Sequence, residues 1–129
     1  MPISQPGKHP VLGILGGLGP AASCYLYQML IDHTPATCDQ DHIDIVISSR
    51  ASTPDRTAFI TGKSKEDPFL VMEQDGKSLV AYGATVLAIP CNTSHYFADR
   101  LQRELSIPLT DANNYCLVGC IETYLPGMQ

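Results

Sequence analysis

The sequence has no run of lysines and arginines, and its 8 basic residues are outnumbered by 13 acidic ones, which gives a formal net charge of −5 at pH 7. Nucleic-acid-binding domains usually carry a basic face that neutralises phosphates, so we expect no nucleic-acid partner. Long apolar runs are also missing before the first predicted strand. We therefore expect neither a signal peptide nor a membrane anchor in this chain.

The cysteines are odd in number and mostly widely spaced. Small secreted proteins use even, closely spaced cysteines as disulfide frameworks, whereas the five here are scattered among predicted helices and strands. This pattern predicts reduced thiols and a cytoplasmic location. The five are Cys24, Cys38, Cys91, Cys116 and Cys120.

Apolar and β-branched runs alternate with segments of helical spacing. The alternation predicts an α/β fold of three layers, with a parallel sheet of about four strands. We expect a flexible lead-in at 1–10 and a single domain at 11–129 with an atypical tail after 111. The predicted strands are 11–15, 43–47, 85–89 and one beginning at 107, and the predicted helices are 21–31, about 68–82, 94–105 and one within 113–129.

Glycine and proline punctuate the predicted elements. Pro20 fits the first position of a helix, where the missing N–H is no loss, and the glycines before it permit a positive φ and close approach of a ligand. Gly83 is a stop signal for the helix before it. The polar loop 48–57 follows the second strand, where substrate contacts are expected in a parallel sheet.

Cys91 stands where the apolar strand 85–89 ends and a helix should begin. Free N–H groups and partial positive charge at a helix start favour a thiolate, and the following Asn92, Thr93 and Ser94 are able to cap the helix or to donate to an anion. When no family resemblance is considered, a single cysteine at the end of a strand is more often a small buried apolar residue than a catalytic one.

Three motifs occur in order: GGLGPAAS after the first strand, TPDRT after the second, and AIPCNTSH at the third. Together they resemble the aspartate/glutamate racemase family, over residues 11–111. The resemblance implies a flavodoxin-like fold and racemisation of a small acidic amino acid by two thiols, without a cofactor. It covers only the first of the two similar halves that such racemases possess.

The resemblance also implies roles for individual residues. Cys91 would be the first acid/base, and Asn92 and Thr93 would donate to the substrate carboxylate. Arg56, in TPDRT, would pair with a carboxylate, which suits its planar fork. The turn containing Gly17 and Gly19 would let the substrate approach the backbone.

The second family cysteine lies in a GCTE-like motif well downstream of this chain. Cys120 superficially resembles it but follows Cys91 by only 29 positions. We therefore expect a half-length chain, truncated, cleaved or frameshifted, with impaired or no turnover. An uncovered face would favour a homo-oligomer. Hydantoin racemases and maleate isomerases use a similar scaffold, so their activities are secondary hypotheses.

Two other functions remain open. The stretch 17–22 matches the G-x-G-x-x-A dinucleotide fingerprint, and Ser48-Ser49-Arg50 would suit the 2′-phosphate of NADP. A non-catalytic half-domain that dimerises is the third reading. No metal is implied, since Cys116 and Cys120 lack further ligands nearby. Ordinary structural roles are expected for Cys24, Cys38, His33, His42 and Asp55, whereas His95 either supports the Cys91 thiolate or bonds to backbone or water.

Overall fold

The computed structural model describes residues 9–90 and 95–111 of the chain. Strands and helices alternate along it, as the sequence predicts. The strands are β1 (Val11–Gly16), β2 (Asp44–Ser49), β3 (Val86–Ile89) and β4 (Leu109–Asp111). The helices are α1 (Pro20–His33), α2 (Arg56–Ile60), α3 (Phe69–Tyr82) and α4 (His95–Glu104), and a 3-10 turn, η1 (Asp39–Asp41), precedes β2.

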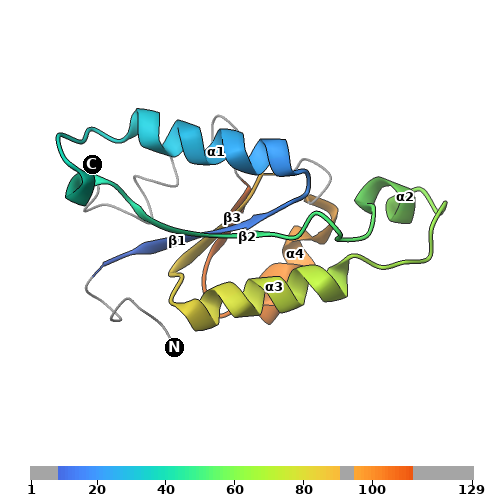
Figure 1. Cartoon of the computed structure of the whole chain (residues 1–129). Helices are drawn as coiled ribbons and strands as arrows, with labels where there is room; N and C mark the ends of the chain where they lie inside the picture. Colours follow the sequence, from blue (N-terminus) through green and yellow to red (C-terminus); the bar gives the residue numbers. More distant parts are fainter. Residues whose placement is uncertain (1–8, 91–94, 112–129) are drawn as a thin grey trace.

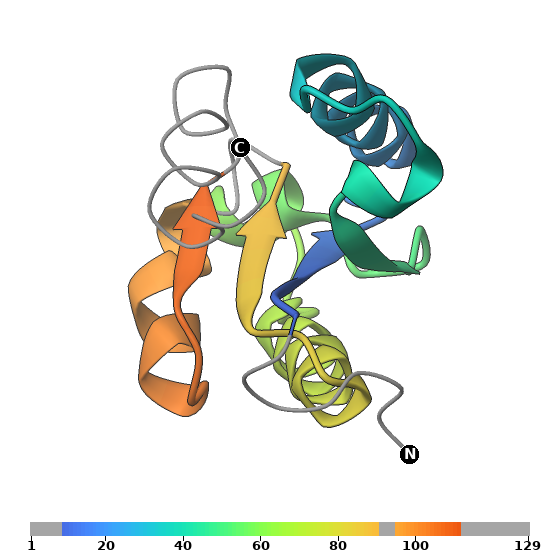
Figure 2. The ribbon, with the colours of Figure 1, turned by 90° about the vertical axis from the view of Figure 1, so that its left-hand side faces the viewer.

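All neighbouring strands pair in parallel, in the order β2-β1-β3-β4. Helix α1 covers one face of the sheet, and α3 and α4 cover the other (Figures 1 and 2). This is the predicted three-layer α/β fold. Because the chain leaves β1 toward β2 on one side and returns to β3 on the other, the order reverses between β1 and β3, where parallel sheets open a crevice for ligands.

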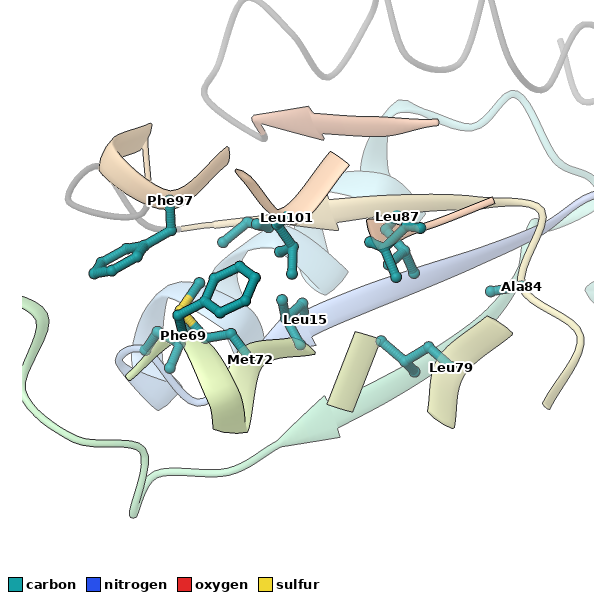
Figure 3. Packing of buried hydrophobic residues seen from close by; sticks show 11 residues of the cluster. Leu15, Phe69, Met72, Leu79, Ala84, Leu87, Phe97 and Leu101 are labelled. Atoms are coloured by element: carbon teal, nitrogen blue, oxygen red, sulfur yellow. The ribbon is translucent and has the colours of Figure 1, made fainter. Parts of the chain in front are cut away.

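Two apolar clusters flank the sheet, because successive side chains of a strand point to opposite faces. Leu12 and Ile14 pack with Leu26 and Leu30 of α1. The opposite cluster is larger and joins β1 and β3 to α3 and α4 (Figure 3). Its labelled members in that view are Leu15, Phe69, Met72, Leu79, Ala84, Leu87, Phe97 and Leu101.

The helix boundaries follow the predicted signals. Pro20 occupies the first turn of α1 directly after the N-cap Gly19. Helix α3 ends at Gly83, whose φ of 131° is a conformation that side chains with a Cβ rarely adopt. Both expectations are confirmed.

The segments that connect the long helices and strands differ from the sequence-based prediction more than the elements themselves do. Ser48 and Ser49, predicted as loop, are the last residues of β2, where they pair with Leu15 and Gly16. The five-residue α2 begins inside the predicted loop 48–57, and η1 was not predicted. Short helices of this kind depend on tertiary contacts more than on local sequence.

No helix in residues 9–90 and 95–111 combines the length and the hydropathy needed to cross a membrane.

Candidate active site

The carboxyl ends of the parallel strands meet at one edge of the sheet. The turn after β1, the loop after β2 and the start of α4 after β3 all lie there, and Figure 1 places α2 beyond this end of the sheet. Predicted site residues Gly17, Gly19 and Arg56 belong to these segments. Cys91, Asn92 and Thr93 lie outside the described residues, in the segment that connects β3 to α4.

The turn after β1 is closed by a serine that the sequence reading did not single out. Gly17 N donates to Oγ of Ser23 at 2.9 Å, and this Oγ lies 3.5 Å from the carbonyl oxygen of Gly19, to which it donates. Ser23 is buried in the first turns of α1. The space around Gly19 is open, because a β-carbon there would meet no described atom within 4 Å. The turn is thus fixed from the inside and accessible from the outside.

Arg56 is the first residue of α2, and it is half-buried. Its Nη1 donates to the carbonyl oxygens of Thr53 and Pro54, at 3.4 and 3.2 Å. Its Nε is buried and finds no hydrogen-bond partner in the described part of the chain. Asp55 does not pair with it; the Asp55 carboxylate caps α2 by accepting from Ala58 N at 3.1 Å. The structural role expected for Asp55 is therefore confirmed.

Helix α2 is attached to α4 through an aromatic contact. The rings of Phe59 and Phe97 lie 6.1 Å apart between centroids, and Phe97 is buried. Helix α4 is also held to the start of α3, where the guanidinium of Arg100 lies 3.7 Å from the centroid of Phe69. The helix that carries Arg56 is thereby packed against the helix that follows Cys91.

A second arginine near this edge, Arg50, pairs with an acidic residue. Its Nε and Nη2 donate to the two carboxylate oxygens of Asp75 in α3, at 2.8 and 2.9 Å. The hydrogen bonds to Asp75, and then the negative charge of the Asp75 carboxylate, raise the pKa of Arg50 above the ordinary value for arginine. The Nε/Nη2 edge of this guanidinium is occupied by Asp75 and is no longer open to a 2′-phosphate, which weighs against the NADP hypothesis. Neither Asp75 nor this pairing was predicted from the sequence.

The remaining candidate residues are placed as follows. Cys24 is exposed on α1, and Cys38 is exposed directly before η1. Cys116 and Cys120 lie outside the described residues, as does the side chain of His95. Among residues 9–90 and 95–111, no three His, Cys, Asp or Glu side chains gather as metal ligands.

A separate hollow of about 340 Å³ lies between the second half of α1 and the start of β2. It belongs to the opposite end of the sheet, because α1 runs back along β1. No arginine or lysine stands among its described lining residues, so no guanidinium or ammonium group there would hold a carboxylate. The lining residues are Tyr27, Leu30, Ile31, Thr34, Asp39, His42, Ile43 and Ile45.

The fold is that of an open parallel α/β protein, a class in which ligands bind at the reversal of strand order. The sequence profile of the family described as Asp/Glu/Hydantoin racemase matches residues 15–113. The match covers most of the chain and includes all three motifs. The chain belongs to the Asp/Glu/Hydantoin racemase family.

Solved structures agree with this assignment. An aspartate racemase of Picrophilus torridus matches with a TM-score of 0.67 and 28% identity, over 81% of this chain and 43% of that one. An aspartate racemase homologue of Pyrococcus horikoshii and a putative Asp/Glu racemase of Yersinia pestis share the fold at TM-scores of 0.62 and 0.64, with 23% and 20% identity. They are matched over 79% and 78% of this chain and 44% of each of theirs. The chain thus spans less than half the length of these relatives.

Proposed function

We propose that this chain provides one half of an amino-acid racemase site, which binds aspartate or glutamate and moves its α-proton with a thiol and no cofactor. Family membership supports the reaction class. The likeness to an aspartate racemase supports an acidic substrate. The Arg56 end of the sheet supplies the cation that such a substrate requires.

The observation that carries the proposal is the state of Arg56. No carboxylate within the described residues pairs with its guanidinium, whereas Arg50 and Arg100 both have an acidic partner. An Nε that is buried without a partner is costly, because the group has given up its bonds to water. An arginine held in this way at the carboxyl edge is suited to a carboxylate that arrives with the substrate.

The proposed reaction uses one thiolate on one side of the α-carbon. The Sγ of Cys91 takes the α-proton, and the electron pair of the C–H bond moves into the substrate's α-carboxylate. Asn92 and Thr93 donate hydrogen bonds to the oxygens on which this charge grows. The thiol then returns a proton to the same carbon, and the thiolate is regenerated.

A single thiol returns the proton to the face from which it came. The resemblance places the second thiol of the family in the half that these matches do not cover. We therefore propose that this chain alone exchanges the α-proton of its substrate while inverting it slowly or not at all.

The test is deuterium uptake at the α-carbon of L-aspartate and of L-glutamate in D2O, followed by NMR, with chiral chromatography for inversion. We expect uptake with wild type, loss of uptake with Cys91→Ser, and full uptake with the matched variant Cys24→Ser, which changes an exposed thiol on α1. Uptake that survives in Cys91→Ser, or that is absent from wild type, refutes the acid/base role. Binding of the substrate without any uptake in wild type would favour the non-catalytic half-domain.

A further inference from the structure

Asp75 interrupts the buried side of α3. A carboxylate in such a position is costly unless hydrogen-bonded charge compensates it. Only 7% of the Asp75 side chain is exposed, and both of its oxygens accept from Arg50. The buried residues of α3 are Phe69, Met72, Asp75, Gly76 and Leu79.

The main chain of Arg50 continues this connection toward Arg56. The Arg50 carbonyl oxygen accepts from Thr53 N at 3.2 Å and from Thr53 Oγ1 at 2.7 Å, and Thr53 is buried. The carbonyl oxygens of Thr53 and Pro54 accept in turn from Nη1 of Arg56. An unbroken series of hydrogen bonds therefore joins the middle of α3 to the Arg56 guanidinium.

We propose that Asp75 and Arg50 are positioning residues, which hold the 50–56 loop so that the Arg56 guanidinium is ready for the substrate's carboxylate. The inference rests on the proposed function in one respect, namely that Arg56 binds this carboxylate. Two parallel N–H···O bonds fix both the distance and the rotation of Arg50 relative to α3, which a lysine cannot do. A loop that is ordered before binding loses less entropy when the ligand arrives.

The geometry argues against a direct ligand role for Asp75, and it directs two of the Arg50 donors away from a ligand. Both oxygens of Asp75 are occupied by Arg50, and the residue lies inside the α3 layer of the fold. The two donors that Arg50 spends on Asp75 face α3. Their effect on a ligand must therefore pass through the loop and Arg56.

The test is a double-mutant cycle on the affinity for L-aspartate, measured by calorimetry with wild type, Asp75→Asn, Arg56→Ala and the double variant. We expect Arg56→Ala to weaken binding by about tenfold or more. Asp75→Asn should weaken binding by about three- to tenfold when Arg56 is present, and hardly at all when Arg56 is absent. Arg50→Lys, which keeps the charge but loses the fork, should behave like Asp75→Asn.

Glu73→Gln is the matched control, because Glu73 lies two residues before Asp75 on the same helix and pairs with Lys77 instead of Arg50. A second readout needs no ligand: amide hydrogen exchange at Ala58 and Phe59 should accelerate in Asp75→Asn and not in Glu73→Gln. Circular dichroism confirms that each variant is folded at the temperature used.

The outcomes separate the two proposals. Unchanged affinity in Arg56→Ala, or no binding by wild type, refutes the proposed role of Arg56. Loss of affinity in Arg56→Ala together with an equal effect of Asp75→Asn in both backgrounds overturns the positioning role alone. Unaltered exchange at Ala58 and Phe59 in Asp75→Asn also overturns it.

Discussion

Gly17 lies directly against the main chain of Arg50. A β-carbon built on Gly17 would fall 2.5 Å from Arg50 N and 2.6 Å from its carbonyl carbon, and the φ of Gly17 is 86°. The turn after β1 and the loop after β2 are therefore in contact through their backbones. Through this contact the glycine motif packs against the start of the loop that leads to the TPDRT motif.

Replacing Gly17 with Ala should destabilise the protein by more than about 1 kcal/mol, because a positive φ and a backbone clash both act against the new side chain. Gly62→Ala is a matched control, since Gly62 has a φ of 82° with no described atom within 4 Å of the built β-carbon. Urea unfolding of both variants isolates the contact with Arg50. Equal losses of stability would mean that the contact contributes nothing.

Hydrophobic periodicity, together with glycine and proline at the ends of elements, predicted most of the fold, because each long helix or strand carries these signals in its own sequence. Helix α1 was expected at 21–31 and spans Pro20–His33, and β3 was expected at 85–89 and spans Val86–Ile89. The apolar faces of such elements also determine the two core clusters. These features depend on neighbours in sequence, where a single chain is informative.

The site was less predictable, because its organisation depends on residues far apart in sequence. Arg50 and Asp75 are separated by 25 positions, and an aspartate in a helix normally indicates an exposed face. Helix α2 exists where Phe59 meets Phe97, which no local pattern reveals. Arg56 was selected by the family motif, and its environment came only from the structure.

NADPH should not bind to this chain. Two donors of the guanidinium that would recognise a 2′-phosphate, Nε and Nη2, are already engaged by the oxygens of Asp75. Titration with the protein should leave the nucleotide's fluorescence without a saturable change. Saturable binding that disappears in Arg50→Ala would reinstate the dinucleotide reading.

The connection between α1 and β2 contains a pH-sensitive bond. The pKa of Asp41 lies below its ordinary value, because the backbone N–H and then the hydroxyl of Thr37 donate to Oδ2, at 3.0 and 3.1 Å. Since the folded pKa is the lower one, this stabilisation is present above the unfolded pKa of about 3.9 and is lost as the pH falls through the folded value.

An NMR titration of the Asp41 carboxyl should therefore show a midpoint below that of an unfolded peptide. Thr37→Ala should move the midpoint upward only in part, because the backbone donor remains. Thr61→Ala, whose hydroxyl donates to the Thr57 carbonyl oxygen in α2, is the control and should not move it. A midpoint of Asp41 at or above the peptide value would contradict the assigned bonds.

Self-association is expected at the carboxyl edge of the sheet. Three large apolar side chains are exposed there: Ile60, Leu70 and Tyr96 expose 37%, 65% and 65% of their surface. Ile60 is the last residue of α2, and Leu70 and Tyr96 are the second residues of α3 and α4. The match to this chain covers 43% of an aspartate racemase, so that relative has a further part that these helices do not contain. Exposed apolar side chains favour association with another copy.

Light scattering at several protein concentrations should therefore give a mass that rises from monomer toward dimer. The double variant Leu70→Ser/Tyr96→Ser should shift this transition to concentrations about tenfold higher, since each truncation removes apolar area from the contact. Tyr25→Ser is the matched control, because Tyr25 is 61% exposed on α1, which covers the opposite face of the sheet. If Tyr25→Ser shifts the transition and the double variant does not, the association surface lies on α1; a constant monomer mass rules out association at either surface.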